Sequence, residues 1–197
     1  MALRVVLAGV LGGVVVFFWG AISHTVTPLG MMGLSMLPQS REAELTDVVR
    51  GVVPADGLYF YPGREMDREQ TPEVEKVWAD KLAKGPYGLL LVHKEGGAAM
   101  RPDQLGKELA TDMLGAFLVA LLLSTTRLNY AGRVGFCAVV GLCGWINVGV
   151  PYWTWYGFPT AFTVSSGIEE LVGWTLAGLV LAALMRRPKT TADPLAI

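Results

Sequence analysis

Five polar side chains at the ends of apolar segments could carry chemistry: His24, Asp112, Asn147, Glu169 and Glu170. A histidine with two or three carboxylates can bind a divalent metal or pass protons, and ionisable groups inside membrane spans are costly and often functional. The alternative is that these residues cap helix ends and hydrogen-bond to their neighbours, because acids favour the dipole at a helix N-terminus. No spaced ligand motif and no catalytic motif accompanies them. The sequence therefore names no catalytic residue, leaves a metal open and predicts no cofactor.

The segments that carry these residues are long enough to cross a membrane. Hydrophobic residues make up 52% of the 197 residues and charged residues 17%, against about 25% charged in a soluble domain. A spanning helix needs roughly 20 mostly apolar residues. Four segments meet this requirement: 5–22, 109–125, 134–150 and 167–185. We expect the first to be a retained helix, because its aromatic end, Phe17-Phe18-Trp19, suits a membrane interface better than a signal-peptide cleavage site.

Charge predicts the orientation of these spans. With four spans both termini lie on one side, and the short segments of that side carry six basic residues against one acid, Asp193; the basic residues are Arg4, Arg127, Arg133, Arg186, Arg187 and Lys189. The positive-inside rule then places both termini in the cytoplasm and residues 23–108 outside. The net charge of −1 provides no basic field for nucleic acid.

The region between the first two spans has mixed charge and its own secondary-structure signals. The spacing of apolar residues predicts a helix over 41–52, and Thr71 followed by Pro72 predicts the start of a helix over 71–84. Strands are expected at 58–61 and 87–93. The predicted fold is an α-helical membrane protein with four transmembrane helices and a small α+β extracytoplasmic domain between helices 1 and 2. Its parts are helix 1 (1–24), the domain (25–108), a three-helix region (109–190) and a cytoplasmic tail (191–197).

An aromatic segment before the fourth span is expected to be an outer loop over 151–162. Its rings are Tyr152, Trp153, Trp155, Tyr156 and Phe158. Such rings anchor proteins at the membrane interface, and this density could also contact a partner subunit or a lipid, quinone or pigment. Small residues recur three or four apart in the spans, as at Gly9 and Gly13, and permit close packing within the protein or with another protein.

Four motifs together resemble those of an uncharacterised family of small bacterial four-span inner-membrane proteins. They are Trp19-Gly-Ala-Ile-Ser-His24, Gly57-Leu-Tyr-Phe-Tyr-Pro62, Tyr152-Trp-Thr-Trp-Tyr-Gly-Phe158 and Gly173-Trp-Thr-Leu-Ala-Gly-Leu179. The resemblance implies a bacterial origin and the same order of spans, and it brings no activity or site residue.

Three function classes fit these features. The first is a structural or accessory subunit of a larger bacterial membrane assembly, such as a respiratory or photosynthetic one, with membrane lipids and other membrane subunits as partners. It would contact them through glycine-rich helix faces and the aromatic loop. The alternatives are a small transporter or ion-path protein and a membrane enzyme, both using the polar residues at the outer leaflet.

Overall fold

The computed structural model describes residues 2–185 of the chain. They form two compact units. The helical unit holds the described residues up to Gly33, Met100–Trp153 and those from Phe158 onward. The second unit holds Leu34–Ala99 together with Thr154–Gly157. The predicted tail 191–197, with Asp193, and the basic residues Arg186, Arg187 and Lys189 lie outside the described residues.

Four long helices make up the helical unit, and each is long and apolar enough to cross a membrane. At 1.5 Å per residue their 24 to 27 residues span about 36 to 40 Å, more than the roughly 30 Å of a hydrocarbon core. The prediction of four helices long and apolar enough to span a membrane, in a mostly helical chain, is therefore confirmed. The helices are α1 (Ala2–Thr25), α4 (Pro102–Thr125), α5 (Tyr130–Tyr156) and α6 (Thr160–Leu184).

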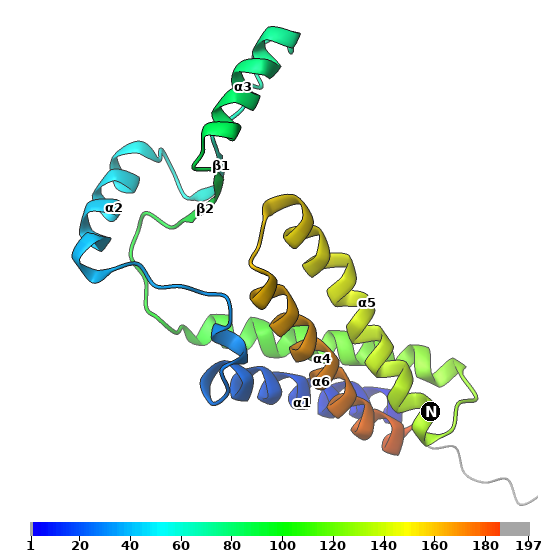
Figure 1. The fold of residues 1–197 in the computed structure, drawn as a ribbon. Helices are drawn as coiled ribbons and strands as arrows, with labels where there is room; N and C mark the ends of the chain where they lie inside the picture. The colour runs from blue at the N-terminus through cyan, green and yellow to red at the C-terminus, as the bar shows by residue number, and fades with distance from the viewer. Residues whose placement is uncertain (1, 186–197) are drawn as a thin grey trace, which may run out of the picture. The chain divides into compact units, whose positions relative to one another are not determined.

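Glycines let α1 lie close to two other helices, α4 and α6 (Figure 1). A Cβ atom placed on Gly13 would lie 2.4 Å from the backbone of Met113 in α4, and one on Gly9 would lie 2.7 Å from Cβ of Phe117. Toward α6, a Cβ on Gly12 would lie 2.2 Å from a methyl group of Leu181. The small residues of α1 are therefore used inside this unit, where they allow the helix backbones to approach.

Helix α5 is attached to the unit mainly through α6. A Cβ on Gly178 of α6 would lie 2.9 Å from Cβ of Cys137, and one on Gly141 would lie 2.6 Å from the ring of Trp174. At the end of α6, the buried Arg133 donates from Nη1 to the carbonyl oxygen of Met185 at 2.7 Å. A cation there satisfies a terminal carbonyl and complements the negative end of the helix dipole.

The expected aromatic loop over 151–162 is wrong. Helix α5 continues through Pro151 to Tyr156, and α6 begins at Thr160, so only three residues connect the two helices. Proline costs an interior helix one hydrogen bond, but no residue after it stops the helix until Gly157. That glycine has a φ of +70°, a conformation that glycine adopts without strain.

The second unit contains the predicted helices and strands in the predicted order: α2 (Gln39–Val52), β1 (Gly57–Tyr61), α3 (Pro72–Lys84) and β2 (Gly88–Val92). Thr71 caps α3, since its hydroxyl accepts a hydrogen bond from the Val74 amide. The two strands pair antiparallel, with Tyr59 opposite Leu90, and they are the whole sheet among the described residues.

Asp56 closes the end of this strand pair. Its Oδ1 accepts a hydrogen bond from the Lys94 amide at 2.8 Å, and its Oδ2 lies 3.5 Å from Nδ1 of His93. The backbone amide of Lys94, and then His93, hold the pKa of the Asp56 carboxyl below its usual range.

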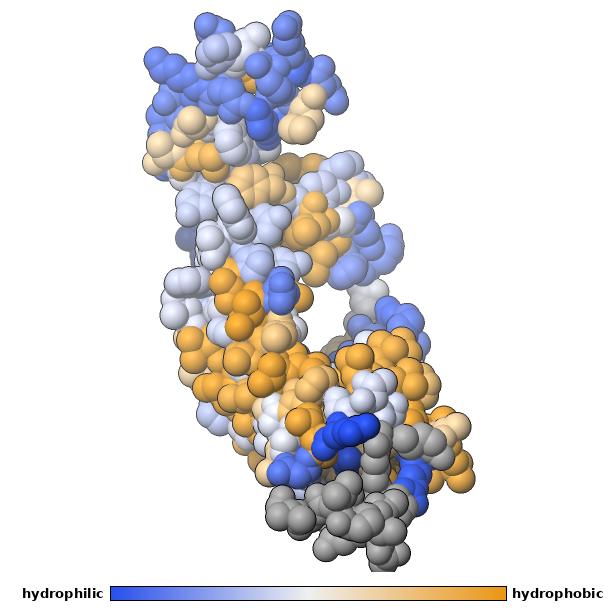
Figure 2. Space-filling view, turned by 90° about the vertical axis from the view of Figure 1, so that its right-hand side faces the viewer, coloured by the Kyte–Doolittle hydropathy of each residue, from blue (hydrophilic) through white to orange (hydrophobic). Residues whose placement is uncertain are grey.

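The two units differ in surface chemistry. In Figure 2 hydrophobic residues cover most of the visible face of the helical unit, whereas the surface around α3 is mainly hydrophilic. The exposed apolar side chains of the four long helices suit contact with lipid.

Candidate functional site

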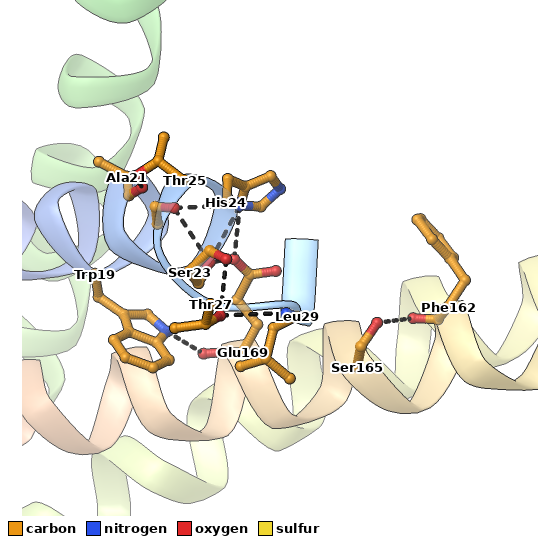
Figure 3. Close-up of polar contacts among 11 residues, drawn as sticks. Trp19, Ala21, Ser23, His24, Thr25, Thr27, Leu29, Phe162, Ser165 and Glu169 are labelled. Atoms are coloured by element: carbon orange, nitrogen blue, oxygen red, sulfur yellow. Dashed lines mark hydrogen bonds and ion pairs between the residues drawn. The ribbon is translucent and has the colours of Figure 1, made fainter. Parts of the chain in front are cut away.

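The end of α1 meets the middle of α6 through a group of polar side chains (Figure 3). The hydroxyl of Ser23, which is fully buried, donates to Oε1 of Glu169. The same carboxylate oxygen lies 2.9 Å from Nδ1 of His24. The indole N–H of Trp19 donates to the backbone carbonyl of Glu169 at 2.9 Å. One turn of α1 therefore holds one residue of α6 by both its side chain and its backbone.

The arrangement of Ser23, His24 and Glu169 differs from a catalytic triad. In a triad the hydroxyl and the carboxylate contact opposite nitrogens of the imidazole. Here both lie on the Nδ1 side, with Ser23 Oγ at 3.1 Å and Glu169 Oε1 at 2.9 Å. The geometry thus provides no relay that would activate Ser23 as a nucleophile.

The surroundings of Nδ1 orient the His24 ring. Acceptor oxygens from Gly20, at 3.2 Å, and from Glu169 flank this nitrogen, which assigns a proton to it. Within residues 2–185, Nε2 takes part in no hydrogen bond. The carboxylate of Glu169 thus fixes the ring from its Nδ1 side, and His24 also lines the space between the helices.

That space is a groove of about 720 Å³ formed by α1, α4 and α6, together with Met100 just before α4. Four of the five predicted polar residues line it: His24, Asp112, Glu169 and Glu170. Glu170 accepts a hydrogen bond from the indole of Trp174 at 3.1 Å, and Asp112 is half-buried on α4. The structure therefore brings together residues that lie up to 146 positions apart.

Asn147 does not reach the groove. Its side-chain amide donates to the Cys143 carbonyl at 2.7 Å, within α5 itself. Such a bond to the preceding turn satisfies the amide locally. The inclusion of Asn147 in the polar cluster is wrong, because depth in the membrane does not determine which side of a helix a residue occupies.

Glu169 and Glu170 do hydrogen-bond to neighbours, as the alternative expects, but its placement of the acids at helix ends is wrong. Helix α4 begins at Pro102 and α6 at Thr160, so Asp112, Glu169 and Glu170 lie about three turns inside their helices. The dipole effect falls off within the first turn. These carboxylates therefore occupy helix interiors. Their positions are explained by the groove that they line and by their hydrogen-bond partners, and not by the helix ends.

Three lining residues escaped sequence reasoning: Trp19, Trp174 and Glu108. Glu108 lies four positions before Asp112, so the two share a helix face, but it falls just outside the predicted span, which begins at residue 109. The two tryptophans are recognisable only by their hydrogen bonds to α6 carbonyl and carboxylate oxygens.

The predicted aromatic contact residues lie at the end of α5 and in the following turn. Tyr152, Phe158 and Phe162 stack in sequence, with ring centroids 5.2 and 5.5 Å apart. The indole of Trp153 donates to Oγ1 of Thr160 at 3.2 Å. Trp155 is 80% exposed, and Tyr156 is also exposed. The contacts between these rings brace the turn, while the exposed Trp155 is accessible to lipid or a partner.

Neither a metal site nor a related protein identifies a function for this chain. Within the described part of the chain no group of three His, Cys, Asp or Glu side chains is placed to hold a metal ion. Protein-family models, curated proteins and solved structures include no match to this chain. The family resemblance therefore stays a prediction, and what the protein does is argued from its own geometry.

Proposed function

We propose that this protein is an accessory subunit of a larger bacterial inner-membrane assembly, such as a respiratory or photosynthetic one. The observation that carries the proposal is the outward surface of α5. Only Arg133, Cys137 and Gly141 of its 27 residues are buried. Gly13 of α1 and Gly178 of α6 pack against neighbouring helices, whereas no atom lies within 4 Å of a Cβ placed on Gly135 or Gly144 of α5.

Small residues that remain open on a spanning helix allow a second helix to come close. On the same face of α5 as Gly135, at helical spacing, Val139, Leu142 and Ile146 are exposed, so this face is apolar and suited to another membrane helix. The exposed Trp155 and Tyr156 near the end of α5 add aromatic contact area of the kind enriched at protein interfaces. The proposed contact therefore runs along α5 rather than along all the glycine-rich faces.

Native mass spectrometry of the tagged protein, extracted in mild detergent from its own host, tests this role. We expect co-eluting subunits with the wild-type chain and their loss with Gly135→Leu, whose side chain would fill the open apolar face. Gly106→Leu is the control, because a Cβ there also meets no atom within 4 Å but lies on α4. A wild-type protein that runs alone, or a Gly135→Leu variant that retains its partners, would contradict the proposal.

The proposal includes an orientation. The starts of α1 and α5 and the end of α4 carry Arg4, Arg133 and Arg127, which favours a cytoplasmic location for these helix ends and for both termini. Residues 23–108 then lie on the extracytoplasmic side, where α2, β1, α3 and β2 would form the small α+β domain.

Labelling of an introduced cysteine checks the orientation. With Lys76→Cys on α3 and the exposed Cys143 replaced by alanine, an impermeant maleimide should label intact cells whose outer membrane has been opened. A cysteine at Arg127 should be labelled only after the inner membrane is broken. The reverse pattern would invert the topology.

A second candidate is an ion-path protein or membrane enzyme, favoured by the groove that gathers His24 with Asp112, Glu169 and Glu170. A transport route needs polar side chains across the whole bilayer, whereas these four gather in one groove where the end of α1 meets the interiors of α4 and α6. The groove is better understood as a binding site.

A further inference from the structure

We infer that the groove between α1, α4 and α6 binds a lipophilic organic cation, with a single ammonium group on an apolar chain. The inference is independent of the accessory-subunit role, because it rests on residues that α5 does not supply. Every residue that lines the groove belongs to the helical unit.

The size and walls of the groove fit the apolar part of such a ligand. Its volume of about 720 Å³ lies in the range of roughly 300 to 1,000 Å³ that is usual for small-molecule sites. The walls include Val16, Phe17, Leu105 and the rings of Trp19 and Trp174. These side chains would cover an alkyl chain, and a tryptophan face attracts a cation.

The charge of the groove selects the head group. Four carboxylates line it, Glu108, Asp112, Glu169 and Glu170, and no lysine or arginine does. Two of them are already engaged, Glu169 by Ser23 and His24 and Glu170 by Trp174.

The other two carboxylates lack a counter-charge. Neither Glu108 nor Asp112 makes a hydrogen bond or ion pair within residues 2–185, and the nearby cations Arg101 and Lys107 both pair with Asp103 instead. An ammonium group between Glu108 and Asp112 would supply that charge where low polarity strengthens the attraction.

A phospholipid is a poorer occupant than a free cation. Its phosphate would meet the same carboxylates that attract its amine, and like charges at close range are destabilising. The ligand class is therefore a cation without an adjacent anionic group.

Titration with decyltrimethylammonium tests the inference, with decyl sulfate as the probe of equal chain length and opposite charge. The full-length protein is held in a nonionic maltoside detergent, and bound probe is counted by native mass spectrometry. We expect one decyltrimethylammonium per chain and no matching decyl sulfate adduct. The double variant Asp112→Asn/Glu108→Gln should weaken cation binding by about tenfold or more, because it removes the two uncompensated charges.

Two further comparisons keep the result decisive. The control variant Glu42→Gln/Asp80→Asn removes two carboxylates from exposed positions of α2 and α3 and should bind as the wild type does. If the double variant does not fold, Glu108→Gln alone applies, since Glu108 is exposed. Equal binding of both probes, or equal cation binding by the groove and control variants, would overturn the inference.

Discussion

Alanine at Gly13 is expected to push α1 away from α4 and to lower the free energy of unfolding by about 3 kcal/mol. The added Cβ would lie 2.4 Å from both Cα and N of Met113. Backbone atoms of a packed helix cannot rotate aside as a flexible side chain can, so the two helices must separate. Separation also opens the contacts of Val5 and Ala8 with the buried core of the unit.

Gly20→Ala is the matched control in the same helix. No atom lies within 4 Å of a Cβ at this position, so the variant should differ from the wild type by no more than the helix-propensity gain of about 1 kcal/mol. Unfolding by SDS in lipid bicelles, followed by far-ultraviolet circular dichroism, measures both variants. If both unfold at the same SDS fraction as the wild type, the close contact between α1 and α4 is wrong.

Replacement of Glu169 by alanine is expected to lower the free energy of unfolding by about 2 kcal/mol. The change removes the acceptor of the Ser23 hydroxyl and the partner of His24. Ser23 is fully buried, so water cannot replace the lost oxygen. Glu170→Ala should cost less, because that carboxylate bonds only to Trp174 of its own helix among the described residues.

A double-mutant cycle separates this contact from general effects of charge removal. Ser23→Ala combined with Glu169→Ala should show a coupling of about 1 to 2 kcal/mol. Ser23→Ala combined with Glu170→Ala should be additive, since no bond joins those two residues. Additivity in the first pair would show that the Ser23–Glu169 bond does not connect α1 to α6.

Local sequence features were sufficient to predict the type and order of the main helices and strands, although not the extension of α5 through residues 151–156. Hydropathy counted along the chain identified four spans, because a helix of about 20 apolar residues is stable in a bilayer wherever it packs. Thr71 and Pro72 marked the start of α3 because a helix cap needs only the residues of its own first turn. Hydropathy predicted the helix starts less well. Helices α4 and α6 each begin seven residues before the predicted span, because backbone hydrogen bonds extend a helix into polar sequence whose hydropathy is low.

The composition of the site was decided by the tertiary structure. The sequence alone predicted that His24, Asp112, Glu169 and Glu170 lie at similar depth, because each position was counted along a predicted span. Only the packing decided that these four share a groove while Asn147 bonds within α5. Packing also decided that α4 and α6 lie against Gly9, Gly12 and Gly13 of α1 while no atom lies close to Gly144. The physical reason is that the rotation of each helix about its axis depends on contacts between residues far apart in the chain, and no local pattern records those contacts.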